Sequence, residues 1–113
     1  MSNKKESKFQ KDTLDELEER YPGVLALKND AKYLQGIPDF SLYLKTAEGL
    51  KTAFLEFKKS ADAPHQPNQN DYIEQLNDMG GFARFIYPEN KNEVISELDD
   101  YFDIHLGEGL ISE

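Results

Sequence analysis

The sequence contains no cysteine and no tryptophan, and it has far fewer basic than acidic residues. Without cysteine there are no disulfide bonds and no thiolate ligands, so a bound metal ion would be held by oxygen or imidazole groups. No segment approaches the roughly 20 apolar residues of a membrane-spanning helix. The Lys-rich N-terminus has no apolar run behind it, unlike a signal peptide. We therefore expect a cytoplasmic protein without a membrane partner.

The length and the overall balance of residue types are those of one folded domain. The 113 residues give room for one hydrophobic core and a single catalytic or binding centre. Hydrophobic residues make up 38% of the chain and charged residues 31%, which is typical of a globular protein with a strongly solvated surface. We expect a single domain over residues 1–113, in which residues 104–113 form a loose C-terminal tail.

The net charge argues against contact with phosphate groups, but the uneven distribution of charged residues along the sequence weakens this argument. Thirteen basic residues against 22 acidic ones give a formal net charge of −9, the wrong sign for a partner of nucleic acids. The acids are concentrated toward the ends, with five in residues 12–19 and seven in residues 93–113. Residues 28–59 hold six lysines against four acids. Lysines in residues 4–11 form a second basic cluster, which serves either phosphate contact or solubility.

The first half of the chain reads as a helix followed by three strands. Apolar residues recur at helical spacing between residues 9 and 21 and predict an amphipathic helix that ends at Pro22 and Gly23. A short apolar run over residues 24–27 predicts a strand. Residues 39–45 and 53–58 each alternate between apolar and polar side chains, and a turn lies between them, so we expect a β-hairpin.

The second half adds a helix, a strand and a helix. Apolar residues from Tyr72 to Met79 mark a helix that stops at Gly80 and Gly81. Residues 82–87 return as a strand, whose Phe82, Phe85 and Ile86 are predicted core residues, and residues 94–102 carry the apolar stripe of a last helix. The order αβββαβα predicts an α/β (α+β) fold, a mixed four-stranded sheet flanked by helices.

Two carboxylates and an amine are expected to converge on one face of the hairpin. Glu56 and Lys58 are two residues apart in a strand, so their side chains leave the same face. Asp39 begins the preceding strand, and antiparallel pairing can bring it beside Glu56. Two carboxylates can hold Mg²⁺ or Mn²⁺, which activates water against a phosphodiester, and a lysine can stabilise the charge on phosphorus. Taken singly, Pro-Asp is typical of a turn and Glu-x-Lys of a solvated strand face.

The order and spacing of these residues carry a resemblance to a known family. Residues 36–40 (GIPDF) and 54–58 (FLEFK) resemble the motif of the PD-(D/E)XK nuclease superfamily. Residues 67–69 (PNQ), which open the second helix, make the chain similar to the phage-type VRR-NUC group, which is related to Holliday junction resolvases. The resemblance covers roughly residues 6–102 and implies a restriction-endonuclease-like core.

The resemblance also implies a catalytic centre. Its metal ligands would be Asp39, Glu56 and the backbone carbonyl of Phe57, and Lys58 would orient or activate the attacking water. Gln69 would sit beside this centre as an auxiliary residue. The alternative for Gln69 is a polar residue of the first helical turn that touches only solvent.

Three further residues are weaker candidates. Glu6 matches the family's N-terminal acidic residue, which contacts the metal or its water, and an ordinary glutamate in the first helical turn is the equal alternative. Lys59 lies on the opposite strand face from Lys58 and is expected to be solvated or to contact phosphate. His65, in the loop after the hairpin, either approaches the scissile phosphate or is simply exposed to solvent.

From these residues we expect a Mg²⁺- or Mn²⁺-dependent endonuclease that hydrolyses phosphodiester bonds in DNA. The resemblance further implies selectivity for branched or junction DNA, a homodimer, and a phage-encoded protein in the host cytoplasm. The alternative is a catalytically silent protein of the nuclease fold, which binds a basic partner or mimics DNA through its acidic surface. The presence of Asp39, Glu56 and Lys58 together favours the enzyme, since a protein that has lost catalytic activity need not keep all three residues.

Overall fold

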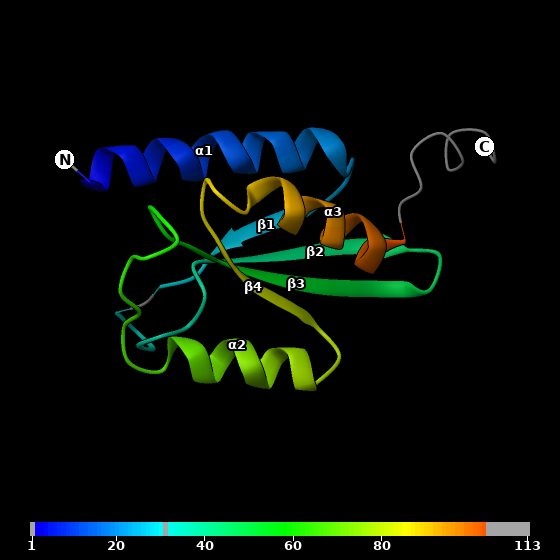
Figure 1. Cartoon of the computed structure of the whole chain (residues 1–113). Helices are drawn as coiled ribbons and strands as arrows, with labels where there is room; N and C mark the ends of the chain where they lie inside the picture. Colours follow the sequence, from blue (N-terminus) through cyan, green and yellow to red (C-terminus); the bar gives the residue numbers. More distant parts are fainter. Residues whose placement is uncertain (1, 31, 104–113) are drawn as a thin grey trace.

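A four-stranded mixed sheet lies between helices on both of its faces (Figure 1). The structure, a computed structural model, describes residues 2–30 and 32–103, with side chains from Glu6 onward; the expected tail over residues 104–113 lies outside this range. The elements are α1 (Ser2–Arg20), β1 (Leu25–Lys28), β2 (Phe40–Thr46), β3 (Gly49–Phe57), α2 (Gln69–Asp78), β4 (Phe82–Ile86) and α3 (Lys91–Phe102). The predicted order αβββαβα and the mixed sheet flanked by helices are confirmed.

The strands are arranged in sequence order, β1-β2-β3-β4. The first three are antiparallel, and β2 and β3 form the expected hairpin, in which Thr46 pairs with Gly49 across a two-residue turn. Gly49 has a φ of +104°, which suits glycine because it has no Cβ. β4 is parallel to β3, so the chain must cross between them, and α2 makes that crossing.

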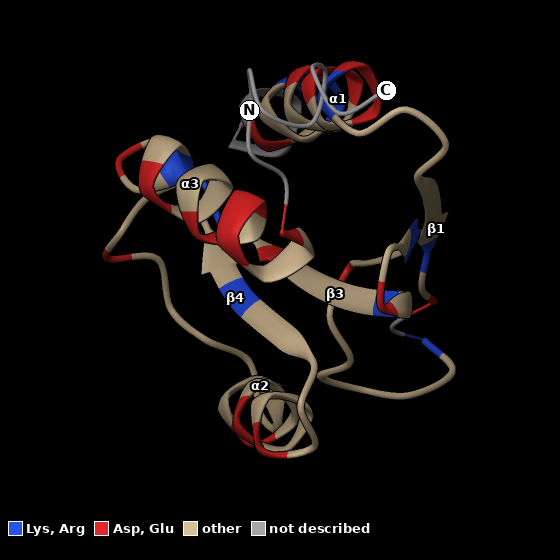
Figure 2. Ribbon diagram, turned by 90° about the vertical axis from the view of Figure 1, so that its right-hand side faces the viewer, with Lys and Arg blue, Asp and Glu red and all other residues tan. Residues whose placement is uncertain are grey.

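The hydrophobic core lies between the sheet and the two helices α1 and α3, which cover the same face (Figures 1 and 2). Alternation along β2 and β3 sends Leu42, Leu55 and Phe57 to this face, where each is at most 1% exposed. Leu17 of α1 and Leu98 of α3 pack against them with no exposed surface. Within the described part of the chain, each helix is too short or too polar to cross a lipid bilayer.

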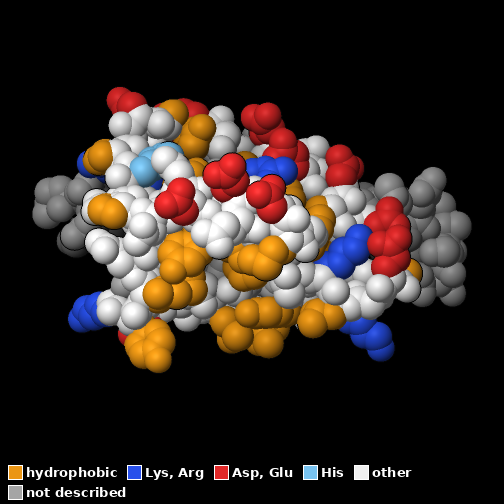
Figure 3. Space-filling view, turned by 90° about the horizontal axis from the view of Figure 1, so that it is seen from below, with side chains coloured by type: hydrophobic (Ala, Val, Ile, Leu, Met, Phe, Trp, Pro, Cys, Tyr) orange, Lys and Arg blue, Asp and Glu red, His pale blue; other side chains and the backbone are white. Residues whose placement is uncertain are grey.

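The opposite face of the sheet carries the polar residues of the hairpin and is covered in part by α2. Leu25 and Leu27 of the edge strand β1 remain 54% and 45% exposed. Hydrophobic side chains are accordingly visible on the surface when the molecule is viewed from the α2 side (Figure 3).

One predicted core residue belongs to this second face. Phe82 and Ile86 are buried in the core as expected, but Phe85 is only partly buried and lies outside it. The prediction for Phe85 is wrong because side chains alternate between the two faces of a strand. Phe85 is three residues from Phe82 and one from Ile86, so its side chain points to the face opposite theirs. Its ring faces the side of the sheet where Glu56, its partner in β3, is found.

The two helices over the core are joined by a partly buried ion pair. Arg20, at the end of α1, donates hydrogen bonds to both carboxylate oxygens of Asp99 in α3. Tyr21 donates a third hydrogen bond to the same carboxylate, with an O–O distance of 2.6 Å. Burial alone would raise the pKa of Asp99, but the hydrogen bonds from Arg20 and Tyr21 lower it. The charged carboxylate is therefore the form that holds α1 against α3.

We expect the substitution Asp99→Asn to lower the free energy of unfolding by about 2 kcal/mol, because hydrogen bonds to charged groups contribute about 1.5–3 kcal/mol. Urea unfolding at pH 7 measures this. The difference from the wild type should narrow as the pH falls below about 4, where the carboxyl group becomes protonated. Asp100→Asn removes the same charge from an exposed position of α3 and is the matched control. An equal loss in both variants would contradict the role of this ion pair.

Candidate active site

Asp39 and Glu56 meet at one end of the hairpin. Phe40 pairs with Leu55, so Asp39, which directly precedes β2, lies opposite Glu56. A carboxylate oxygen of Asp39 accepts a hydrogen bond from the backbone N–H of Phe57 at 2.8 Å. The two carboxyl groups are within hydrogen-bonding reach of each other. The structure thus brings together the two acidic residues that the sequence analysis paired.

The backbone around Asp39 is fixed by Asn29, the residue after β1. The backbone N–H of Asn29 donates to the carbonyl oxygen of Asp39 at 2.8 Å. Its side-chain amide donates to the carbonyl of Pro38 at 2.9 Å and to the hydroxyl of Ser41 at 2.8 Å. These three bonds hold the start of β2 against the end of β1. This contribution of Asn29 was not predicted from the sequence.

Gly36 fixes the same loop against the start of α2. It has a φ of +91°, and a Cβ at this position would lie 2.6 Å from the Cβ of Asn68 and 2.7 Å from the carbonyl oxygen of Pro67. Only glycine allows so close an approach. The segment that carries Asp39 therefore packs directly on the segment that leads into Gln69, although the two are about 30 positions apart in the sequence.

Gln69 links Glu56 to Lys58. Its side-chain N–H donates to a carboxylate oxygen of Glu56 at 2.9 Å, and its side-chain oxygen accepts from the ammonium of Lys58 at 2.7 Å. The same oxygen accepts from the backbone N–H of Gln66, and the Lys58 ammonium also donates to the carbonyl of Pro64. Gln69 is only 7% exposed. The alternative in which Gln69 touches only solvent is therefore wrong.

Burial of the two carboxyl groups shifts their pKa values. Burial, and next the negative charge of Asp39, raise the pKa of Glu56 to about 8 against the opposing effect of the Lys58 charge. Burial also raises the pKa of Asp39, although the N–H of Phe57 favours its charged form. The Oε1 atom of Glu56 is buried and has no hydrogen-bond partner among the residues that the structure describes. A proton or a cation between the two groups would relieve their repulsion.

The donor set at this position fits a hard divalent cation. The candidates are carboxylate oxygens of Asp39 and Glu56 and the backbone carbonyl of Phe57, and Mg²⁺ and Mn²⁺ prefer oxygen ligands. The buried Oε1 of Glu56 is an oxygen still free to act as a ligand. Over residues 2–30 and 32–103, no group of three or more His, Cys, Asp or Glu side chains is gathered closely enough to hold an ion. A cation here would therefore depend on the backbone carbonyl and on water as well as on the two carboxylates.

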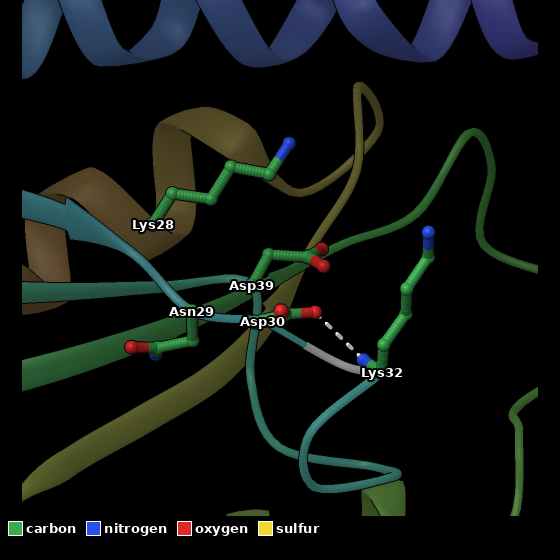
Figure 4. A pocket seen from close by; sticks show the side chains of 5 residues that line it. All are labelled: Lys28, Asn29, Asp30, Lys32 and Asp39. Atoms are coloured by element: carbon green, nitrogen blue, oxygen red, sulfur yellow. Dashed lines mark hydrogen bonds between the residues drawn. The ribbon is translucent and has the colours of Figure 1, made fainter.

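Two cavities border the carboxylate pair. The first, here called the Asp39 cavity, has a volume of about 440 Å³ and is lined by Lys28, Asn29, Asp30, Lys32 and Asp39 (Figure 4). The second, the Glu56 cavity, has a volume of about 280 Å³ and is lined by Glu6, Glu56, Phe57, Lys58, Lys59, Ala63, Pro64, Gln66 and Gln69. Each cavity is thus lined by one of the two carboxylates.

Glu6 reaches the site from the start of α1. It lines the Glu56 cavity and is partly buried. Burial first, and then the negative charge of Asp39, raise the pKa of Glu6, whereas the charges of Lys58 and Lys59 act in the opposite direction. The structure therefore places Glu6 near the other candidates, and its contact with a metal ion stays a prediction.

His65 and Phe85 form a stacked pair beside Lys58. Their ring centroids are 4.0 Å apart and the ring planes differ by 19°. His65 is exposed, and its Nδ1 lies 2.8 Å from the side-chain oxygen of Asn70. The Lys58 ammonium is 6.0 Å from the centroid of the Phe85 ring. Sequence analysis missed this pair because it assigned Phe85 to the core; strict alternation along β4 was the signal that could have found it.

Comparisons with known proteins found similarity to solved structures only. No family model matches the sequence. No curated protein matches it either. A solved structure titled "VRR_NUC domain protein" is similar, with 23% sequence identity, a TM-score of 0.49, and coverage of 70% of this chain and 68% of that chain. The function proposed for this site therefore rests on the residues of the chain itself.

The raised pKa of Glu56 predicts how stability depends on pH when divalent metal is absent. A carboxyl group with a raised pKa stabilises the fold fully below its ordinary value of 4.5, and this contribution is lost as the pH rises through about 8. We expect the stability of the wild type in EDTA to fall between about pH 5 and about pH 8, and that of Glu56→Gln to fall much less. Urea unfolding across this pH range measures both.

The matched control for this experiment is Glu74→Gln, which removes one negative charge from an exposed position of α2. Its stability curve should run parallel to that of the wild type. If the Glu56→Gln curve also ran parallel to that of the wild type, the claim that burial and repulsion raise the pKa of Glu56 would be refuted.

Proposed function

We propose that this protein is a divalent-metal-dependent nuclease that hydrolyses phosphodiester bonds in DNA. The observation that carries the proposal is the buried cluster in which Asp39 lies opposite Glu56 and Gln69 joins Glu56 to Lys58. A buried and a partly buried carboxylate with raised pKa values are unfavourable for a fold that does not use them. The same residues carry the motif resemblance to PD-(D/E)XK nucleases of the VRR-NUC type.

Asp39, Glu56 and the backbone carbonyl of Phe57 would hold Mg²⁺ or Mn²⁺. When bound, the ion would polarise the phosphate and lower the pKa of a water molecule. The ring of Phe57 is packed edge-on against Phe9 and Phe40 in the core, which leaves its main chain to face the Glu56 cavity. Glu6, on the wall of the same cavity, would assist by contacting the ion or its water.

Lys58 would stabilise negative charge on the phosphate. An ammonium group has three N–H bonds, and two of those of Lys58 are used by Gln69 and Pro64. The third is left for a ligand in the Glu56 cavity, where Lys58 is one of the lining residues. Gln69 is a positioning residue, because its amide holds the Lys58 ammonium and the Glu56 carboxylate at fixed places. Such preorganised charge is effective in a site from which water is largely excluded.

The proposal extends to DNA structure and assembly on the basis of the motif resemblance. One site of this kind cuts one strand, so cleavage of a branched or junction substrate calls for two sites and hence for a homodimer. The exposed leucines of β1 supply an apolar surface of the kind that subunits bury between them. The resemblance is also the basis for proposing a phage-encoded protein that acts in the host cytoplasm.

A binding protein without catalytic activity is the second candidate. Acidic residues in residues 12–19 of α1 and along α3 favour it, since they concentrate negative charge on these two segments (Figure 2). Such a surface could engage a basic partner or imitate DNA. Cleavage of DNA separates the two candidates directly.

We expect the wild type to cut plasmid or branched DNA in the presence of Mg²⁺ or Mn²⁺. Lys58→Ala and Asp39→Ala should each lower the cleavage rate by roughly 100- to 1,000-fold, because each removes a group that stabilises charge at the phosphate. Gel electrophoresis over a time course gives the rates. Lys45→Ala, at an exposed position near the hairpin turn, is the control that removes a lysine away from the site. Cleavage that never occurs, or that survives both site substitutions, would refute the nuclease.

A further inference from the structure

The lysines that lack an ion-pair partner are concentrated around the carboxylate pair. Six basic side chains form ion pairs with acids elsewhere: Lys8, Lys11, Arg20, Lys51, Arg84 and Lys91. Among the side chains described by the structure, those with no acidic partner are Lys28, Lys32, Lys45, Lys58 and Lys59. All of these except Lys45 line one of the two cavities. Among the side chains that the structure describes, most lysines without an ion-pair partner are therefore gathered at the site, in a protein with a net charge of −9.

Two of these lysines flank Asp39. Lys28 ends β1 and Lys32 belongs to the loop that follows, and both side chains are exposed. Figure 4 shows both of them extending around the Asp39 carboxylate from these two segments of the chain. The Lys28 ammonium lies 5.9 Å from the centroid of the Phe40 ring. Both lysines therefore line the Asp39 cavity together with the carboxylate.

The acid nearest to these lysines in the sequence does not neutralise them. Asp30 also lines the Asp39 cavity, but its Oδ1 accepts a hydrogen bond from the backbone N–H of Lys32 at 2.9 Å. This bond shapes the turn, in which the carbonyl oxygen of Asp30 accepts from the N–H of Tyr33. Within the described residues no acid forms an ion pair with Lys28 or Lys32, although the positive charge of Lys28 favours the charged form of Asp39. Both ammonium groups can therefore contact a ligand.

We propose that Lys28 and Lys32 form a phosphate-binding subsite, which holds a backbone phosphate next to the one cut at Asp39 and Glu56. This inference rests on the nuclease function proposed above. The lysine ammonium is a compact point charge and lacks the planar, bidentate donor geometry of the arginine guanidinium. It therefore suits a phosphodiester that is bound by charge and not by a fixed hydrogen-bond geometry. Lys59 lines the Glu56 cavity. The nucleic-acid strand would then run from the Asp39 cavity to the Glu56 cavity, with the carboxylate pair between them.

The subsite also accounts for how a strongly acidic protein can approach DNA. Repulsion from acidic residues elsewhere is screened beyond a Debye length of about 8 Å at physiological ionic strength. The residues lining the two cavities include as many lysines as acids, so the site itself does not share the excess of negative charge. Lysines that neutralise phosphates release counterions, and each contact makes binding more sensitive to salt. The subsite can therefore be detected through salt dependence, without any cleavage.

The test is DNA binding in EDTA, measured by fluorescence anisotropy with a labelled oligonucleotide in single-stranded and duplex form. Each of Lys28→Gln and Lys32→Gln should reduce the slope of log Kd against log salt by about 0.7 for the single strand or about 0.9 for the duplex. The double variant should show about twice that change. Lys45→Gln removes the same charge outside the two cavities and should leave the slope unchanged. Lys28→Arg/Lys32→Arg keeps both charges and should also keep the slope.

The outcomes separate this inference from the proposed function, because binding in EDTA does not require catalysis. If the protein fails to cut DNA but the double Gln variant shows the expected reduction of the salt slope, the phosphate-binding subsite is supported and the nuclease proposal is refuted. If the protein cuts DNA and the slopes of the Gln variants equal that of Lys45→Gln, the subsite is wrong. Absence of salt-dependent binding by the wild type would also overturn it. Displacement of DNA by low millimolar inorganic phosphate would overturn it in favour of a site for the free anion.

Discussion

The burial of two carboxyl groups side by side is the constraint on which the rest of the site depends. Asp39 and Glu56 each lose hydration and repel each other when both are charged, which costs free energy that the fold must recover elsewhere. Two hydrogen bonds offset part of this cost: the backbone N–H of Phe57 donates to Asp39, and the Gln69 side-chain amide donates to Glu56. What remains is a buried oxygen without a partner. A proton or a divalent cation would satisfy it, and the proposed function requires the cation.

The fold brings three distant segments to this point. The hairpin register places Asp39 opposite Glu56, and the parallel pairing of β3 with β4 places Phe85 beside them. The crossover helix α2 begins at Gln69. Its start is fixed by the close contact of Gly36 with Pro67 and Asn68, the two residues that precede Gln69. The core on the opposite face, closed by α1 and α3, keeps the sheet rigid. The site thus lies on regular elements and on short segments that are tied to them, which is what precise placement of charged groups requires.

Much of this arrangement could be predicted from local sequence patterns. Alternation along residues 39–45 and 53–58 gave the hairpin and the common face of Glu56 and Lys58, because side-chain direction in a strand follows directly from position. The same rule, applied less strictly, misplaced Phe85 in the core. Gln69 and Asn29 lie in or beside loops, and their roles depend on contacts with residues far away in the sequence. The unpaired state of Lys28 and Lys32 could not be predicted either, since it depends on which acids find partners elsewhere.

The central claim is that Asp39 and Glu56 hold one divalent cation beside Lys58. The most direct measurement is an anomalous difference map from crystals of the protein grown or soaked with Mn²⁺. The account predicts one strong peak bounded by the carboxylates of Asp39 and Glu56 and the carbonyl oxygen of Phe57, and its loss in crystals of Asp39→Ala. Crystals that show no Mn²⁺ at this position, at a concentration where Mn²⁺ is ordered elsewhere on the protein, would contradict it.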